Sequence, residues 1–88
     1  MFTFEKLTIA EMLLNQQGKL WEIKLKDNGA KIYGKLLKFY HDNDETGVFD
    51  IVQNIEDVMS SNAHIIFKTE IYHQGQFEGL RLTDIRTF

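Results

Sequence analysis

The chain has 88 residues, of which 43% are hydrophobic and 12% aromatic, a composition typical of globular proteins. A chain of this length buries only about 60–65% of its unfolded surface, so residues 1–88 are expected to form a single domain with a small core. The absence of cysteine excludes disulfides and thiolate metal sites. No stretch approaches the ~20 apolar residues of a membrane span, and the N-terminus has no basic leader. We therefore expect a cytoplasmic protein without a membrane partner.

The net charge of −3 argues against nucleic acid as the partner, but the charge is unevenly distributed. Residues 1–38 contain seven lysines and four acidic residues. Residues 39–57 contain six acidic residues and no lysine or arginine, and the remainder is balanced. The sequence therefore predicts one basic and one acidic surface.

A helix is predicted at the start of the chain. Thr8 followed by Glu11 forms a capping box, and Leu7 and Met12 are spaced for a hydrophobic staple across it. Helical spacing continues at Ile9, Met12, Leu13 and Gln16. Gly18 suits the left-handed C′ position, so the helix is expected to end there.

From Leu20 onward the hydrophobic pattern has a period of two, which predicts a strand over "LWEIKLK". Its odd-numbered side chains are apolar and face inward, whereas Glu22, Lys24 and Lys26 face outward. Asn28-Gly29 is typical of a two-residue type I′ hairpin. That turn pairs Leu25 with Ile32 and Ile23 with Gly34, and it places Tyr33 and the lysines of the second strand on the outer face.

The remaining chain predicts three further strands. They lie in residues 47–55, 63–73 and 79–88, joined by a polar loop, by "EDVMSSN" and by a turn containing Gly75. Gly34 stands inside the second strand, where a strongly bent strand needs a residue without a side chain. The predicted fold class is therefore α+β, an N-terminal helix followed by a five-stranded, strongly bent antiparallel barrel.

Two motifs resemble those of the Sm-like family of small barrels. The first is apolar-x-apolar, a turn glycine, a second glycine and x-Leu, here at Ile23, Leu25, Gly29, Gly34 and Leu36. The second, Ile-Arg-Gly-x-x-Ile, is echoed by "LRLTDI" from Leu80 to Ile85. The resemblance implies an Sm-like or SH3-like barrel. It also implies a homo-oligomer formed by edge-strand pairing, with "HIIFKTEIY" as the contact; the alternative is that this segment is an interior strand of a monomer.

The sequence departs from the Sm pattern at the positions that bind RNA. Sm proteins that bind uridine-rich RNA carry Asp-x-x-Met-Asn after the second glycine, whereas this chain has "FYHDNDETGVFD". Leu82 replaces the glycine of Ile-Arg-Gly, so only Arg81 carries over as an RNA contact. The ending "LRLTDIRTF" is similar to the bacterial Rho-inhibitor family, an Sm-like fold that acts by binding a protein. The resemblance therefore favours a protein partner.

Two candidate binding surfaces follow from these patterns. The basic one combines cations with an aromatic residue for phosphate contact and base stacking: Lys24, Lys26, Lys31, Tyr33, Lys35 and Arg81. The acidic one, in the loop after the second strand, suits a basic partner: Asp42, Asp44 and Glu45. In the alternative interpretation, both are solvated surfaces that keep the protein soluble and protect strand edges.

No pattern in the sequence indicates catalysis. There is no phosphate loop, dinucleotide fingerprint or nucleophile elbow, and His41, His64 and His73 lack metal-ligand spacing. We expect a protein that is not an enzyme and has no cofactor or metal. The first hypothesis is a binding module that regulates a larger machine through protein contacts. The alternatives are a binder of RNA or another single-stranded nucleic acid, and a small inhibitor of the mobile-element type whose acidic loop mimics nucleic acid.

Overall fold

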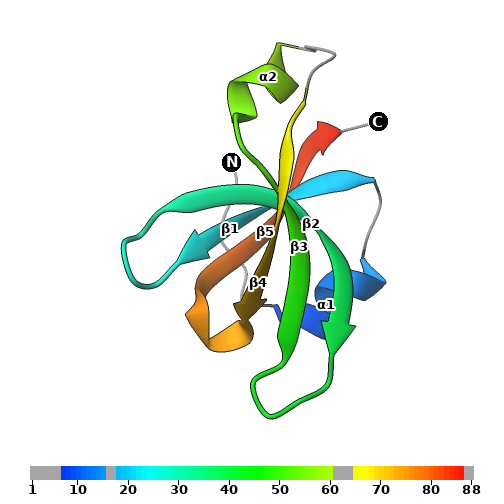
Figure 1. Cartoon of the computed structure of the whole chain (residues 1–88), viewed down its shortest axis with the longest axis vertical. Coiled ribbons are helices and arrows are strands. Elements are labelled where there is room, and N and C mark those ends of the chain that lie inside the picture. Colours follow the sequence, from blue (N-terminus) through cyan, green and yellow to red (C-terminus); the bar gives the residue numbers. More distant parts are fainter. Residues whose placement is uncertain (1–6, 16–17, 61–64, 87–88) are drawn as a thin grey trace.

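The structure is a computed structural model that describes residues 7–15, 18–60 and 65–86. It is a five-stranded antiparallel sheet with two short α-helices and one 3-10 turn (Figure 1). In chain order the elements are α1 (Ile9–Leu14), β1 (Lys19–Leu25), β2 (Lys31–Tyr40), β3 (Thr46–Val52), α2 (Ile55–Met59), β4 (Phe67–His73), η1 (Gln74–Gln76) and β5 (Phe77–Arg86). None of the helices in these described ranges is long and apolar enough to cross a bilayer.

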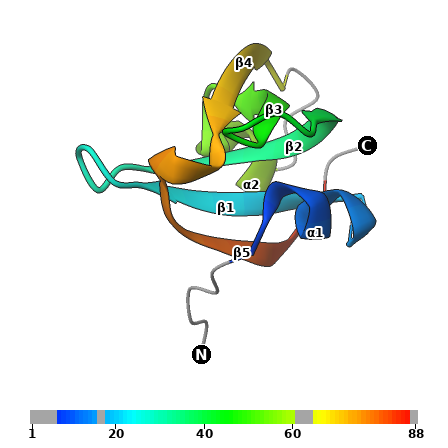
Figure 2. The same ribbon diagram turned by 90° about the horizontal axis from the view of Figure 1, so that it is seen from below.

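The sheet is open, with the strand order β4-β3-β2-β1-β5 (Figure 2). The predicted five antiparallel strands are confirmed, but the predicted closure into a barrel is not, because β4 and β5 remain the two edges of the described sheet. Strand β2 pairs with a different neighbouring strand in each of its two halves. Its first part, Lys31–Gly34, pairs with β1, and its second part, Gly34–Tyr40, pairs with β3.

Gly34 lies where β2 passes from β1 to β3, and it is paired with Trp21 on one side and Ile51 on the other. A Cβ at this position would lie 2.6 Å from the Asp50 carbonyl oxygen and 2.7 Å from Ile51 Cδ1. Glycine is therefore required by the close approach of two strands, which accounts for its position inside a strand.

The first hairpin differs from its predicted register by two residues. Ile23 pairs with Ile32 and Trp21 with Gly34, because the Gly29 N–H donates to the Leu25 carbonyl and closes a four-residue loop. Of the two central turn residues, only Gly29 has a positive φ, 65°. The Asn28 side chain instead accepts from the Ala30 N–H at 2.9 Å, so the type I′ turn was a wrong prediction. A shift of two preserves the side of the sheet on which each side chain lies.

Both faces of the sheet carry buried apolar side chains. The first cluster joins α1 to the inward-facing strand residues: Ile9, Met12, Trp21, Ile23, Leu36, Phe49, Ile51, Phe77 and Leu80. The second lies on the other face and contains Leu20, Val52 and Val58. Val58 belongs to α2, in a segment predicted to be a connection. Glu22, predicted to face outward, is only 4% exposed, and the side chains of Arg81 and Tyr33 contact it.

The predicted helix start is confirmed, since the Glu11 N–H donates to Thr8 Oγ1 at 3.1 Å. The helix ends earlier than predicted, with Asn15 as its C-cap. Gly18 has a positive φ of 70° but lies beyond the C′ position. Gln16 and His64 lie outside the described residues.

Candidate functional site

A cleft of 710 Å³ lies at the end of the sheet where the β2–β3 loop meets the β4–β5 connection. The Gln74 N–H joins these two segments by donating to the carbonyl oxygens of Asp44 and Glu45, at 3.2 Å each. Asp44 and Glu45 line the cleft from one side and Glu78 from the other. Its polar lining also includes Lys26 and His73, and its apolar lining comprises Leu7, Phe77 and Leu80. Among the described residues that line the cleft, three are acidic and one is a lysine, so the cleft is acidic.

Asp42, the first residue of the predicted acidic surface, organises the loop. Its Oδ1 accepts from the Asp44 N–H at 3.1 Å, and its Oδ2 accepts from the Thr46 hydroxyl at 2.7 Å. Thr46 Oγ1 also lies 2.9 Å from Nδ1 of His73. Because the single hydroxyl proton is donated to Asp42, this second bond requires a proton on His73 Nδ1. Asp42 thus has a structural role, and Asp44 and Glu45 are the loop acids that reach the cleft.

The hydrogen bond from Thr46 lowers the pKa of the Asp42 carboxyl below its usual 3.8, with further lowering by backbone hydrogen bonds. A depressed carboxyl pKa contributes stability that is present above the unfolded-state value and is lost as pH falls through the folded-state value. We predict that Asp42→Asn destabilises the protein at neutral pH, and that the difference from wild type vanishes below the folded-state pKa. The free energy of unfolding is measured with urea at neutral pH and at a pH below the folded-state pKa of Asp42. Asp27→Asn, on the exposed turn after β1, is the control. A difference that persists unchanged at low pH would contradict it.

Glu45 is held in an unusual position for a carboxylate. Its backbone has a φ of 49°, the one positive φ of a non-glycine residue among the described residues. Its Oε2 is buried and has no hydrogen-bond partner in the described structure. A buried carboxylate oxygen without a donor is costly, and because this atom is closed off from solvent, a donor in the cleft reaches it only after the Glu45 side chain changes conformation.

The predicted basic surface is organised around a buried carboxylate. Arg81 donates to Glu22 Oε2 at 2.6 Å, and the Tyr33 hydroxyl donates to the same oxygen at 3.2 Å. Lys31 Nζ lies 3.9 Å from Glu22 Oε1. Burial, and then the charge of Glu22, raises the pKa of the Tyr33 hydroxyl. Three of the six predicted residues are therefore brought together, but by an internal acid.

The other three residues of that surface have further contacts of their own. Lys24 forms an ion pair with Glu78 at 3.7 Å, Lys35 Nζ stands 5.5 Å from the centre of the Phe67 ring, and Lys26 lines the acidic cleft. Lys24 and Lys31 are direct cross-strand partners, so these predicted basic residues are neighbours on the sheet, but Glu22 and Glu78 offset part of their charge.

Sequence reasoning missed Glu78, Thr46 and His73 as parts of the site. Glu78 lies more than thirty residues from the acidic loop, and only the η1 connection brings it to the cleft. Thr46 and His73 are direct cross-strand partners of β3 and β4, a pairing that a single sequence does not specify. No group of three or more potential metal ligands occurs in the part of the chain that the structure describes. Comparison of the chain with models of protein families, with curated proteins and with solved structures gives no match.

Proposed function

We propose that the chain is a non-catalytic binding module that regulates a larger protein machine, and that its acidic cleft receives a basic segment of the partner. One observation carries this proposal. Asp44 and Glu45 from one loop and Glu78 from a distant strand line a single cleft, and among the described lining residues Lys26 is the one lysine, although Lys24 pairs with Glu78 at 3.7 Å. Electrostatic complementarity of this kind directs a cationic partner to the cleft and disfavours anionic ones.

The cleft suits the side chain of arginine or lysine. Carboxylates accept charge-assisted hydrogen bonds from a guanidinium, and the acidic residues Asp44, Glu45 and Glu78 line the cleft. Leu7, Phe77 and Leu80 also line the cleft, but Phe77 and Leu80 belong to the first core cluster and are only 8% and 1% exposed. The match to a cationic side chain therefore rests on the acidic residues.

We also propose the finer assignment to the Sm-like or SH3-like small barrels. The features that support it are a helix before the sheet, five successive antiparallel strands and a second strand that bends at Gly34. The RNA alternative receives less support, because Glu22 engages Arg81, Tyr33 and Lys31. A nucleic-acid strand would have to compete with that internal carboxylate.

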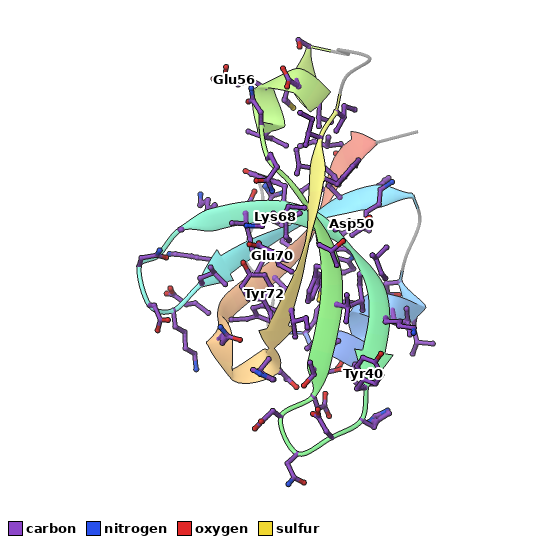
Figure 3. The ribbon with its side chains drawn as sticks, in the orientation of Figure 1. Tyr40, Asp50, Glu56, Lys68, Glu70 and Tyr72 are labelled. Atoms are coloured by element: carbon purple, nitrogen blue, oxygen red, sulfur yellow. The ribbon has the colours of Figure 1, made fainter. Side chains whose placement is uncertain are left out.

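The test is binding of a short arginine-containing peptide, measured by calorimetry at low and high salt. Loss of a charge-assisted hydrogen bond costs about 1.5–3 kcal/mol, so Glu45→Gln is expected to weaken binding by about tenfold or more. Glu78→Gln should weaken it in the same direction. The matched control is Glu56→Gln on α2, which lies at the far end of the molecule from the cleft (Figure 3).

Binding of single-stranded RNA is measured as well, as a test of the RNA-binding alternative. We expect no retention of RNA even at low salt, where counterion release favours binding most. Salt-dependent RNA binding that Arg81→Met weakens, together with peptide binding that Glu45→Gln leaves unchanged, would overturn the proposal.

A further inference from the structure

Strand β4 is a regular, free edge of the open sheet. It pairs with β3 without a register shift from Val52↔Phe67 to Thr46↔His73, and no strand among the described residues covers its other side. The opposite edge, β5, is interrupted by two register shifts in its pairing with β1. Bulges of this kind protect an edge from pairing, whereas a regular edge presents a row of unpaired backbone groups.

The hydrogen-bond pattern shows which backbone groups of β4 point outward. The Gln53 N–H donates to the Ile66 carbonyl at 3.0 Å, so residues 53 and 66 occupy a hydrogen-bonded position of the β3–β4 ladder. In an antiparallel ladder such pairs alternate, which directs every second residue toward the partner strand. The N–H and C=O groups of Phe67, Thr69 and Ile71 therefore point away from β3.

We propose that two copies of the chain associate by pairing their β4 strands antiparallel about a two-fold axis at Thr69. In this register Thr69 faces its own symmetry mate, and the outward-pointing residues of each copy face those of the other, as an antiparallel ladder requires. A two-fold interface of this kind closes on itself and produces a dimer with one continuous sheet.

The side chains of β4 are self-complementary in this register. Lys68 lies opposite Glu70 of the second copy, and Glu70 opposite Lys68, so two cross-strand ion pairs form. Within one chain Lys68 Nζ lies 4.0 Å from Glu70 Oε1, and the two residues are two positions apart along β4 (Figure 3). Any register that places Lys68 opposite Lys68 would lose both pairs, so the charges select the register about Thr69.

The same register supplies partners for exposed apolar side chains. Ile71 is 63% exposed and lies opposite Phe67 of the second copy. Ile66 is 65% exposed and lies opposite Tyr72. Aromatic and β-branched residues are favourable cross-strand pairs, so each contact stabilises the dimer. This surface is separate from the acidic cleft, and loss of the dimer would leave the proposed function standing.

Cysteine crosslinking tests the register directly, because the chain contains no cysteine of its own. Hydrogen-bonded antiparallel partners have Cα atoms about 5.5 Å apart, within the range of a disulfide. Thr69→Cys is therefore expected to form a disulfide-linked dimer under mild oxidation. Ile71→Cys is the matched control, since residue 71 lies four residues from its mate along the strand, about 13 Å away.

The second test exchanges the charges of residues 68 and 70. Dimer formation is measured by sedimentation across a concentration series that reaches millimolar protein. Lys68→Glu is expected to weaken the dimer by about tenfold, since it turns two attractive pairs into repulsive ones. Adding Glu70→Lys should restore association, whereas Lys38→Glu on the exposed part of β2 should leave it unchanged. A monomer throughout the series, a ring of higher mass, or crosslinking at residue 71 and not at residue 69 would overturn the proposal.

Discussion

Gly34→Ala is expected to destabilise the protein by about 2–3 kcal/mol, since inserting a carbon into a well-packed site typically costs 1–3 kcal/mol and here part of the obstacle is backbone. The new Cβ would lie 2.6 Å from the carbonyl oxygen of Asp50. A side chain could rotate away from such a contact, but a carbonyl held in the β2–β3 ladder moves only if the ladder moves. The strand crossing that turns the sheet therefore depends on this glycine.

Urea unfolding measures this effect. Trp21 is the one tryptophan of the chain and is 2% exposed, so its fluorescence reports loss of the first core cluster. Gly75→Ala is the matched control, because a Cβ there would meet no atom within 4 Å and the backbone φ is not positive. Equal stabilities for the two variants would contradict the close approach at Gly34.

Arg81→Met is expected to cost about 2–3 kcal/mol, because it leaves the carboxylate of Glu22 buried without its closest cation. The side chains of Glu22 and Arg81 are only 5% and 16% exposed. Removal of one partner of a buried ion pair typically costs about 3–5 kcal/mol. Here Lys31, whose Nζ lies 3.9 Å from Glu22 Oε1, still compensates part of the carboxylate charge. Arg81 is thus expected to be a structural residue first, although the sequence indicated an RNA contact.

A second substitution separates charge burial from lost packing. Adding Glu22→Gln to Arg81→Met removes the unpaired charge and is expected to recover part of the stability. Lys19→Met is the control, because Lys19 pairs at 3.4 Å with Asp84, whose side chain is 81% exposed, and such pairs contribute about 0–1 kcal/mol. If Arg81→Met lowers the free energy of unfolding no more than Lys19→Met does, the Glu22–Arg81 pair does not have the stabilising role expected of it.

Local sequence signals predicted the parts of the fold that depend on local chemistry. The Thr8 cap, the alternation of β1 and the glycine inside β2 each follow from one residue type at one position. The hairpin register did not, because Asn28-Gly29 fits both a two-residue and a four-residue loop with the same faces. Closure of the sheet depends on whether distant edge strands meet, and no local pattern specifies that.

The candidate site was predicted only where its residues are neighbours in sequence. Asp44 and Glu45 were found because they form a block, whereas Glu78 joins them through tertiary structure. The lysines were grouped correctly by strand face, but the pattern treated Glu22 as one more exposed charge. The structure buries this residue against Arg81, Tyr33 and Lys31, and these contacts join three strands, which a single sequence does not specify.

A nitrogen-15 NMR titration with an arginine-containing peptide tests most directly whether the acidic cleft binds a cationic segment. We expect salt-dependent shifts confined to the amides that line the cleft, in residues 43–45 and 73–80. Glu45→Gln should reduce these shifts, and Glu56→Gln should not. No peptide-induced shifts in the cleft, together with RNA-induced shifts at Lys31, Tyr33 and Arg81, would contradict the account.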